Sequence, residues 1–265
     1  MAGAMKARVN GTEIAYRLDG PETAPVVVLS HSIATTMDMW RGQVPVLVQQ
    51  SRVLSYDMRG HGESAVPAGP YDFELLAADV VGLLDHLKID RAAFVGISIG
   101  GMIGQALGVK HGQRLRGLVL SNTTSDPPPP EMWDQRIADA EKGGMETQVQ
   151  STLGRWFTEA YRRANPAVMD WIAAMIRNTP VNGFAGCGRA IQGLGFANHL
   201  RKITAPTLIM TGDQDPGTTV AMAKTLSNRI PQSLSKTIKG ASHLSAIEKE
   251  SDFNAQLSAF LPLLP

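Results

Sequence analysis

The chain has 265 residues, of which 43% are hydrophobic and 18% charged, and this composition excludes a disordered or fibrous protein. Lys and Arg total 25 against 24 Asp and Glu, and this balance excludes a protein whose role is to coat nucleic acid or an anionic membrane. The single cysteine, Cys187, excludes an intramolecular disulfide and a zinc site built from several thiolates.

The sequence also predicts where the protein resides. No apolar run approaches the roughly 20 residues that a transmembrane helix needs. Residues 1–6 lack the apolar core of a secretory signal peptide. We therefore expect a soluble, cytoplasmic protein that is a monomer or a small homo-oligomer, with no membrane or nucleic-acid partner.

The predicted elements begin with a hairpin, because Asn10-Gly11 lies between two segments of alternating polarity. Continuous apolar runs then predict strands that helices cover on both faces. Helical patterns separate or follow these runs, so we expect an α/β fold with a mostly parallel sheet. The strands are expected at residues 26–29, 53–56, 92–95, 118–120 and 207–210, with a weaker one at 235–238, and the helices at 73–87, 101–111 and 253–261.

The stretch from residue 127 to 198 interrupts this alternation, because it is rich in helical patterns and holds three of the four tryptophans. It lies between the fourth and fifth apolar runs. We interpret it as a helical cap, inserted late in the sheet and resting on one edge of it, where it walls off a pocket. Residues 1–126 and 199–265 then form the α/β core.

The strongest local motif is Gly96-Ile97-Ser98-Ile99-Gly100, because it follows a predicted strand and precedes a predicted helix. In such a turn the serine hydroxyl projects above the sheet, and the glycines leave room for the sharp backbone. The N-terminus of the following helix favours negative charge that develops on a substrate. Ser98 is therefore the predicted nucleophile; the alternative is a glycine-rich turn with an incidental serine.

A nucleophilic serine needs a base, and in enzymes with this strand-to-helix serine the base follows it in the chain. His111 ends the helix that Ser98 begins, and His199 precedes the last clear strand in a basic, polar stretch. His243 lies in a loop of small residues before the last helix. We therefore predict His243 as the base, and the alternative is an ordinary surface histidine.

The base in turn needs a carboxylate that orients its ring. Two candidates follow the strand at residues 207–210, namely Asp213 and Asp215. Asp213 is nearer to the strand and could cap the next turn. We favour Asp215, because Pro216 biases its backbone toward an extended conformation that can direct the side chain at the sheet.

The oxyanion of such a reaction is stabilised by backbone N–H groups. We expect one of them from Ile99, directly after the nucleophile, and the other from the loop after the strand at 26–29. In that loop Ile33 is the first candidate and Ser32 the second. His31 in the same loop and the segment 59–62 are interpreted as structural.

Taken together, these motifs resemble the α/β-hydrolase superfamily and, within it, the 3-oxoadipate enol-lactonases. The resemblance implies the α/β-hydrolase fold and hydrolysis of a small carboxylated enol-lactone in the β-ketoadipate pathway of aromatic-compound catabolism. Two segments differ from that family, at residues 31–34 and at 217–219, and these differences concern the substrate and not the triad. The segments that carry the resemblance are 30–40, 57–64, 96–104, 120–124, 155–158, Asp215-Pro216 and 240–243.

A carboxylated substrate requires a cationic partner, for which arginine is well suited. The insertion offers four: Arg136, Arg155, Arg177 and Arg189. We favour Arg155, which is next to Trp156, and then Arg136, although an arginine on a solvated helix face is the ordinary alternative for each. Trp133 and Trp156 are expected in the pocket wall.

We therefore expect a serine hydrolase of ester bonds, without metal or other cofactor, that opens a small lactone. No dinucleotide-binding or phosphate-binding motif is present in the sequence. Either an acyl-enzyme or direct attack by water fits the residues. The alternatives are a carboxylesterase, a hydrolase of carbon–carbon bonds, and a small-molecule receptor that keeps the fold without turnover.

Overall fold

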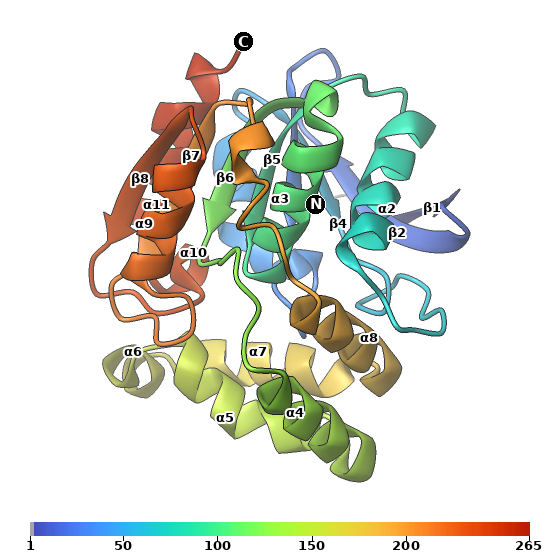
Figure 1. The fold of residues 1–265 in the computed structure, drawn as a ribbon, viewed down its shortest axis with the longest axis vertical. Helices are drawn as coiled ribbons and strands as arrows, with labels where there is room; N and C mark the ends of the chain where they lie inside the picture. The colour runs from blue at the N-terminus through green and yellow to red at the C-terminus, as the bar shows by residue number, and fades with distance from the viewer. Residues whose placement is uncertain (1–2) are drawn as a thin grey trace.

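The centre of the fold is a mixed sheet whose strands follow the order β1-β2-β4-β3-β5-β6-β7-β8 (Figure 1). This computed structural model describes residues 3–265. Residues 1 and 2, which belong both to the segment searched for a signal peptide and to the predicted α/β core, lie outside the described residues. The strands are β1 Met5–Val9, β2 Thr12–Asp19, β3 Val26–Ser30, β4 Arg52–Tyr56, β5 Ala92–Ile97, β6 Leu115–Ser121, β7 Thr207–Gly212 and β8 Ser233–Ile238.

The pairing of these strands confirms the predicted sheet. β1 and β2 form the predicted hairpin, and Asn10 and Gly11 both take positive φ in its turn. β2 pairs with β4 in antiparallel fashion, whereas all pairs from β4–β3 to β7–β8 are parallel. Every residue of β3, β5 and β7 is buried, as continuous apolar runs predict for strands covered on both faces.

The helices connect the strands and cover the sheet. The α-helices outside the insertion are α1 Val44–Leu47, α2 Phe73–His86, α3 Ile99–Lys110, α9 Val220–Arg229, α10 Ser245–Glu248 and α11 Glu250–Phe260. The short 3₁₀ segments are η1 Met37–Gly42, η2 Gly112–Arg114, η3 Leu200–Lys202 and η4 Leu261–Leu263. None of the helices within residues 3–265 is long and apolar enough to cross a bilayer.

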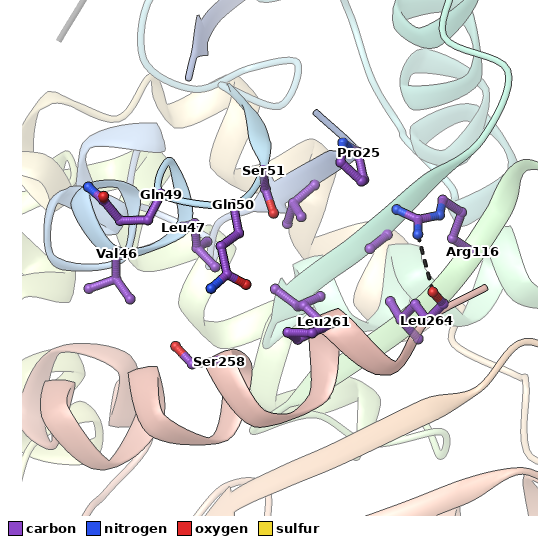
Figure 2. Close-up of a pocket in the computed structure, with 13 residues that line it drawn as sticks. Pro25, Val46, Leu47, Gln49, Gln50, Ser51, Arg116, Ser258, Leu261 and Leu264 are labelled. Carbon is purple, nitrogen blue, oxygen red and sulfur yellow. Dashed lines mark hydrogen bonds between the residues drawn. The ribbon is translucent and has the colours of Figure 1, made fainter. Parts of the chain in front are cut away.

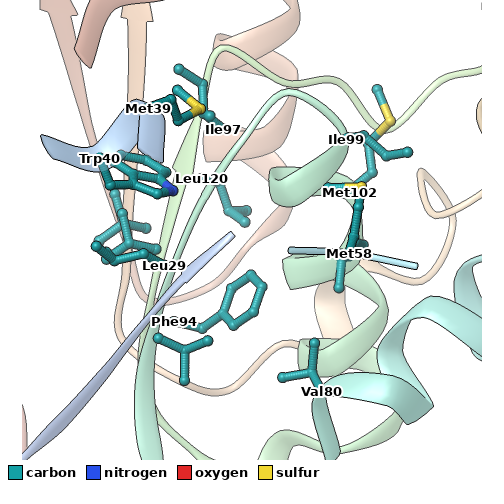
Figure 3. Packing of buried hydrophobic residues seen from close by; sticks show 14 of the residues in the cluster. Leu29, Met39, Trp40, Met58, Val80, Phe94, Ile97, Ile99, Met102 and Leu120 are labelled. Carbon is teal, nitrogen blue, oxygen red and sulfur yellow. The ribbon is translucent and has the colours of Figure 1, made fainter. Parts of the chain in front are cut away.

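The hydrophobic core lies between the sheet and these helices. α3 packs on β5 and β6, while Trp40 from η1 packs against Phe253 of α11 with 6.2 Å between ring centroids. Figure 3 shows Leu29, Phe94 and other apolar side chains that meet in the interior. Burial of such a side chain stabilises the fold by about 1.5–3 kcal/mol. The core therefore fixes the position of the loops at the strand ends.

Five helices occupy the inserted stretch between β6 and β7: α4 Pro130–Gly143, α5 Glu146–Trp156, α6 Glu159–Ala164, α7 Pro166–Asn178 and α8 Val181–Gln192. α4 packs on α5 and α8, and α5 packs on α7. Trp133 of α4 and Phe184 of α8 are in ring contact at 5.7 Å. These helices lie together at one end of the sheet, where the carboxyl ends of its parallel strands point (Figure 1).

Candidate active site

Ser98 lies in the sharp turn between β5 and α3 that the sequence predicts. Its backbone has φ 58° and ψ −121°, a strained conformation for a residue with a side chain. A Cβ at Gly96 would lie 2.2 Å from the carbonyl oxygen of Gly100, and one at Gly100 would lie 2.3 Å from that of Ser30. Only glycine fits at both positions, so these residues permit the turn that places the serine in the wall of a cavity.

Asp215 and His243 form a hydrogen-bonded pair at the ends of β7 and β8. His243 Nδ1 donates to Asp215 Oδ2 at 2.8 Å, which leaves the lone pair on Nε2. Burial opposes ionisation of Asp215, but the electrostatic interaction with His243 and hydrogen bonds from His243 and Thr218 hold the pKa of its carboxyl well below the usual range. The competing candidate, Asp213, is exposed and accepts from the N–H of Gly240 at 2.7 Å.

Several donors besides His243 hold the Asp215 carboxylate in place. Oδ1 accepts from the N–H groups of Gly217 and Thr218 at 2.8 and 3.0 Å, and Oδ2 accepts from Thr218 Oγ1 at 2.5 Å. Asn122 Nδ2 donates to Oδ2 at 2.8 Å, and its own Oδ1 accepts from the hydroxyl of Ser245. This network keeps Asp215 charged and keeps the His243 ring in one orientation.

Ser98 and His243 line the same cavity, together with Asp215. The cavity measures about 140 Å³. Within the described chain the hydrogen bonds of the His243 ring lie at Nδ1, with Asp215 and Thr218, and none of them joins the ring to the Ser98 hydroxyl. A hydrogen bond of this kind is commonly long without substrate and shortens when substrate binds. The cavity therefore brings together the three residues that the sequence predicts as a triad.

Two buried histidines hold the loop that carries Ile33. His31 Nδ1 donates to the carbonyl of Ser32 at 2.8 Å, and its Nε2 accepts from Met58 N at 3.0 Å. His61 Nε2 accepts from the N–H of Ala34, also at 3.0 Å. Both rings are therefore neutral, and they link the segment 31–34 to the segment 58–61. These contacts agree with the structural role predicted for His31 and for the segment 59–62.

These histidines predict an acid-sensitive stability. Burial lowers the pKa of His31 to about 3, with help from the neighbouring His61, and that of His61 to about 4. The unfolded chain then binds more protons than the folded chain below about pH 6.5, so each ring costs about 1.4 kcal/mol of stability per pH unit of acidification. Denaturant unfolding between pH 6.5 and 4.5 measures this slope.

The variant His61→Gln tests the assignment, because glutamine can accept from Ala34 N but does not titrate in this range. Its slope is expected to be smaller than that of the wild type by about 1.4 kcal/mol per pH unit. The exposed His199, changed to glutamine, is the matched control and should leave the slope unchanged. Burial raises the pKa of Asp57 to about 6, but Asp57 and Asp215 are present in all three proteins, so we expect their contributions to cancel. Equal slopes for the wild type and His61→Gln would contradict the neutral buried ring.

The remaining donors that we predict for the oxyanion lie near Ser98. Ile33 lines the cavity, and Ile99 is the first residue of α3, whose first N–H groups have no partner within the helix. Ser32 is fully buried, and its N–H points to the sulfur of Met39 at 3.4 Å, so Ile33 remains the stronger candidate of the two.

Two of the four candidate arginines reach the cavity. Arg136 and Arg155 line it together with Trp133 and Trp156, and both guanidiniums are partly buried. Arg136 lies over the ring of Trp133, 4.2 Å from its centroid. Burial and the charge of Arg155 lower the pKa of Arg136 to about 9, and burial also lowers that of Arg155.

The other two arginines are surface residues with acidic partners. Arg177 pairs with Glu146, and Arg189 pairs with Asp134. By contrast, none of the carboxylates among residues 3–265 lies within ion-pair distance of Arg136 or Arg155. Two cations without an acidic partner, in the cavity that Ser98 also lines, produce an electrostatic environment that favours an anionic ligand.

A larger cavity of about 340 Å³ lies at the opposite end of the sheet, near the amino ends of the parallel strands. Figure 2 shows its wall, in which Arg116 donates to the carbonyl of Leu264. Ser258 is the wall's one hydroxyl on a helix, and no histidine or carboxylate accompanies it there. The described chain likewise holds no group of three or more His, Cys, Asp or Glu side chains that could bind a metal ion.

The residues that hold Asp215 and complete the cavity wall were not predicted from the sequence. Asn122 and Thr218 hold Asp215, and Met102, Thr124 and Ile191 add to the cavity wall. Asn122 follows directly on an apolar strand, at the carboxyl end where parallel sheets place functional side chains, and this position was the available signal.

Comparison with known proteins decides the family. The sequence model described as the alpha/beta hydrolase fold matches residues 25–250. The chain belongs to the α/β-hydrolase family. Two proteins of Acinetobacter baylyi named 3-oxoadipate enol-lactonase are 32% and 34% identical to this α/β-hydrolase, over 93% and 95% of its length and 92% and 94% of theirs.

Solved structures agree with this assignment. An enol-lactonase from Burkholderia xenovorans is 38% identical to this α/β-hydrolase, with a TM-score of 0.95 over 97% of this chain and all of the other. A malate-bound thermophilic esterase from Thermogutta terrifontis is 28% identical, with a TM-score of 0.92 over 98% of both chains. The predicted fold and resemblance are confirmed, and so is the predicted enzyme class, a hydrolase of ester or lactone bonds.

Proposed function

We propose that this α/β-hydrolase opens a small carboxylated lactone, 3-oxoadipate enol-lactone or a close analogue, with Ser98, His243 and Asp215 as the catalytic triad. The observation that carries the proposal is one cavity lined by Ser98, by His243 and by two arginines that form no ion pair. Its volume of about 140 Å³ suits a small substrate, since drug-sized ligands occupy cavities of roughly 300–1,000 Å³. The enol-lactonases of Acinetobacter baylyi support the choice of substrate class.

In the first half of the proposed reaction, Ser98 Oγ attacks the ring carbonyl while His243 Nε2 takes its proton. Asp215 keeps the hydrogen on Nδ1 and stabilises the imidazolium that forms. The N–H groups of Ile99 and Ile33 donate to the oxyanion of the tetrahedral intermediate. The intermediate then expels the ring oxygen as an enol, which receives the proton from His243 and tautomerises to a ketone.

In the second half, water hydrolyses the acyl-enzyme. His243 takes a proton from the water as it attacks the acyl carbonyl, and then returns a proton to Ser98 as the carboxylic acid leaves. Arg136 and Arg155 bind the substrate's own carboxylate, and the rings of Trp133 and Trp156 bound the cavity. In this proposal the helices of residues 127–198 are the cap that excludes water from the reacting atoms, and the flanking segments are the catalytic core.

A panel of four substrates tests the proposal. The panel comprises the enol-lactone, its methyl ester, p-nitrophenyl acetate as a simple ester, and a dienol diketone with a cleavable carbon–carbon bond. We expect the highest kcat/KM for the carboxylated lactone. Fastest turnover of p-nitrophenyl acetate would instead indicate a carboxylesterase, and fastest turnover of the diketone a carbon–carbon hydrolase. Binding of the lactone without any turnover would indicate a receptor.

Removal of either cavity arginine should weaken binding of the carboxylate. Each of the variants Arg136→Met and Arg155→Met keeps the length of the side chain but deletes charge-assisted hydrogen bonds, so KM for the carboxylated lactone should rise about 10–100-fold. KM for the methyl ester should change little. Arg177→Met is the matched control, because Arg177 lies in the same insertion but pairs with Glu146. Equal effects on the two substrates would exclude a carboxylate site at these residues.

A further inference from the structure

A buried carboxylate outside the triad joins the loop of His243 to the inserted helices. Glu248, at the end of α10, is only 6% exposed. Its Oε2 accepts from the N–H of Ser242 at 2.6 Å, and its Oε1 accepts from the N–H and the hydroxyl of Thr158 at 2.9 and 2.5 Å. Ser242 directly precedes the base, while Thr158 begins α6. The two oxygens of one carboxylate therefore link two segments that are distant in the sequence.

These hydrogen bonds offset the free-energy cost of burying the Glu248 carboxylate. A buried ionised group is costly unless it is paired or hydrogen-bonded. In the part of the chain that the structure describes, no Lys, Arg or His side chain forms an ion pair with Glu248. Hydrogen bonds from N–H and O–H groups to a charged acceptor are among the stronger ones in proteins. The carboxylate is stable only while both segments keep their positions.

Two further hydrogen bonds cross the same junction on either side of His243. Ser242 Oγ donates to the carbonyl of Arg155 at 2.8 Å, and the N–H of Leu244 donates to the carbonyl of Trp156 at 3.0 Å. The rings of Trp156 and His243 are nearly parallel, at 20°, with 6.4 Å between their centroids. The end of α5 and the loop that bears the base are thus linked before and after the histidine.

We propose that Glu248 is a positioning residue for His243: it holds the loop of the base against the junction of α5 and α6, so that Nε2 faces Ser98. The inference rests on the proposed function, because it takes His243 as the base of Ser98. It assigns Glu248 no contact with substrate. A displacement of the base by about 1 Å can lower the rate of the chemical step about 100-fold, whereas the substrate site at the arginines stays in place.

The variant Glu248→Gln tests this inference. Its amide nitrogen would face a donor, either Ser242 N or the donors of Thr158, so one side of the junction is lost. The matched control is Glu250→Gln, the same change at an exposed carboxylate two residues away. Two quantities are measured for each variant: kcat and KM for the carboxylated lactone, and the rate at which a fluorophosphonate probe labels Ser98.

For Glu248→Gln we expect kcat and the labelling rate to fall about 10–100-fold, with KM within about threefold of the wild type. Glu250→Gln should match the wild type in all three quantities. A folded Glu248→Gln protein with a lower Tm but an unchanged labelling rate would overturn the inference and leave Glu248 a purely structural residue. If Glu248→Gln does not fold, Thr158→Val, which removes the hydroxyl that donates to Glu248, should slow labelling in the same direction, and an unchanged rate there would also overturn the inference.

The labelling rate separates this inference from the proposed function. Fluorophosphonate labelling depends on the Ser98–His243 pair and not on the lactone. If the wild type is labelled but hydrolyses no lactone, the proposed substrate is wrong, and the labelling rates of Glu248→Gln and Glu250→Gln still decide the role of Glu248.

Discussion

Replacement of Ser98 by alanine is expected to lower kcat for every substrate by about 10⁴–10⁶-fold, the largest effect of any single change in this protein. The physical reason is that the variant retains the cavity, the oxyanion donors and the arginines but has no atom that can form the acyl-enzyme. KM should therefore change little. Mass spectrometry of the intact protein after treatment with a fluorophosphonate should show one added phosphonyl group in the wild type and none in Ser98→Ala.

The control for this experiment is Ser258→Ala. Ser258 is an exposed hydroxyl in the wall of the larger cavity, at the other end of the sheet, where no histidine accompanies it. This variant should be labelled as fast as the wild type. Equal labelling of the wild type and Ser98→Ala, or loss of labelling in Ser258→Ala, would show that the nucleophile lies elsewhere. Residual turnover in Ser98→Ala above about 1% of the wild-type kcat would instead favour direct attack by water.

Replacement of Asp215 by asparagine is expected to lower kcat by about 10⁴-fold. Asparagine can place an NH₂ group against His243 Nδ1, which stabilises the tautomer whose Nε2 carries the hydrogen and cannot take the proton of Ser98. The substitution also removes hydrogen bonds around the residue, because Asn122, Thr218 and the N–H of Gly217 all donate to the carboxylate. We therefore expect a lower Tm together with the loss of kcat, and steady-state kinetics with thermal unfolding of the same samples measures both.

Asp213→Asn separates the two candidate acids. Asp213 lies two residues earlier, is exposed, and accepts from the N–H of Gly240, a hydrogen bond that the asparagine oxygen can keep. Its kcat should stay within about threefold of the wild type, as for most surface substitutions. A large loss of kcat in Asp213→Asn and a small one in Asp215→Asn would reverse the assignment of the acid.

The centre of the sheet could be predicted from the sequence because β3, β5 and β7 are short, apolar runs that are buried throughout. All six of the predicted runs became strands, including the weaker one at 235–238. The start of α3 differed: the predicted helix began at residue 101, but the structure begins it at Ile99, since the strained turn at Ser98 leads directly into the helix. Within the insertion no single helix was assigned, although prolines mark the starts of α4 and α7.

The residues that touch the substrate site could be predicted better than those that support it. Ser98, Asp215 and His243 lie in motifs whose local context suggests their chemistry. Asn122 acts through a hydrogen bond to a residue 93 positions away, and no local pattern records such a contact. The arginines show the same limit, because the sequence around them does not record that helix packing brings Glu146 to Arg177 and Trp133 to Arg136.

The hydrogen bonds between the end of α5 and the loop of His243 have a consequence for how small molecules enter and leave. A movement of the end of α5 away from the sheet would also displace His243 from Asp215. We therefore expect the cavity to open at the side away from this junction. There the first turn of α4 contributes Met132, which lines the cavity and is 46% exposed, and Pro128 from the proline run that precedes it. Prolines lack the N–H that would bond this connection to its neighbours. We therefore expect reactant and product to pass beneath the start of α4.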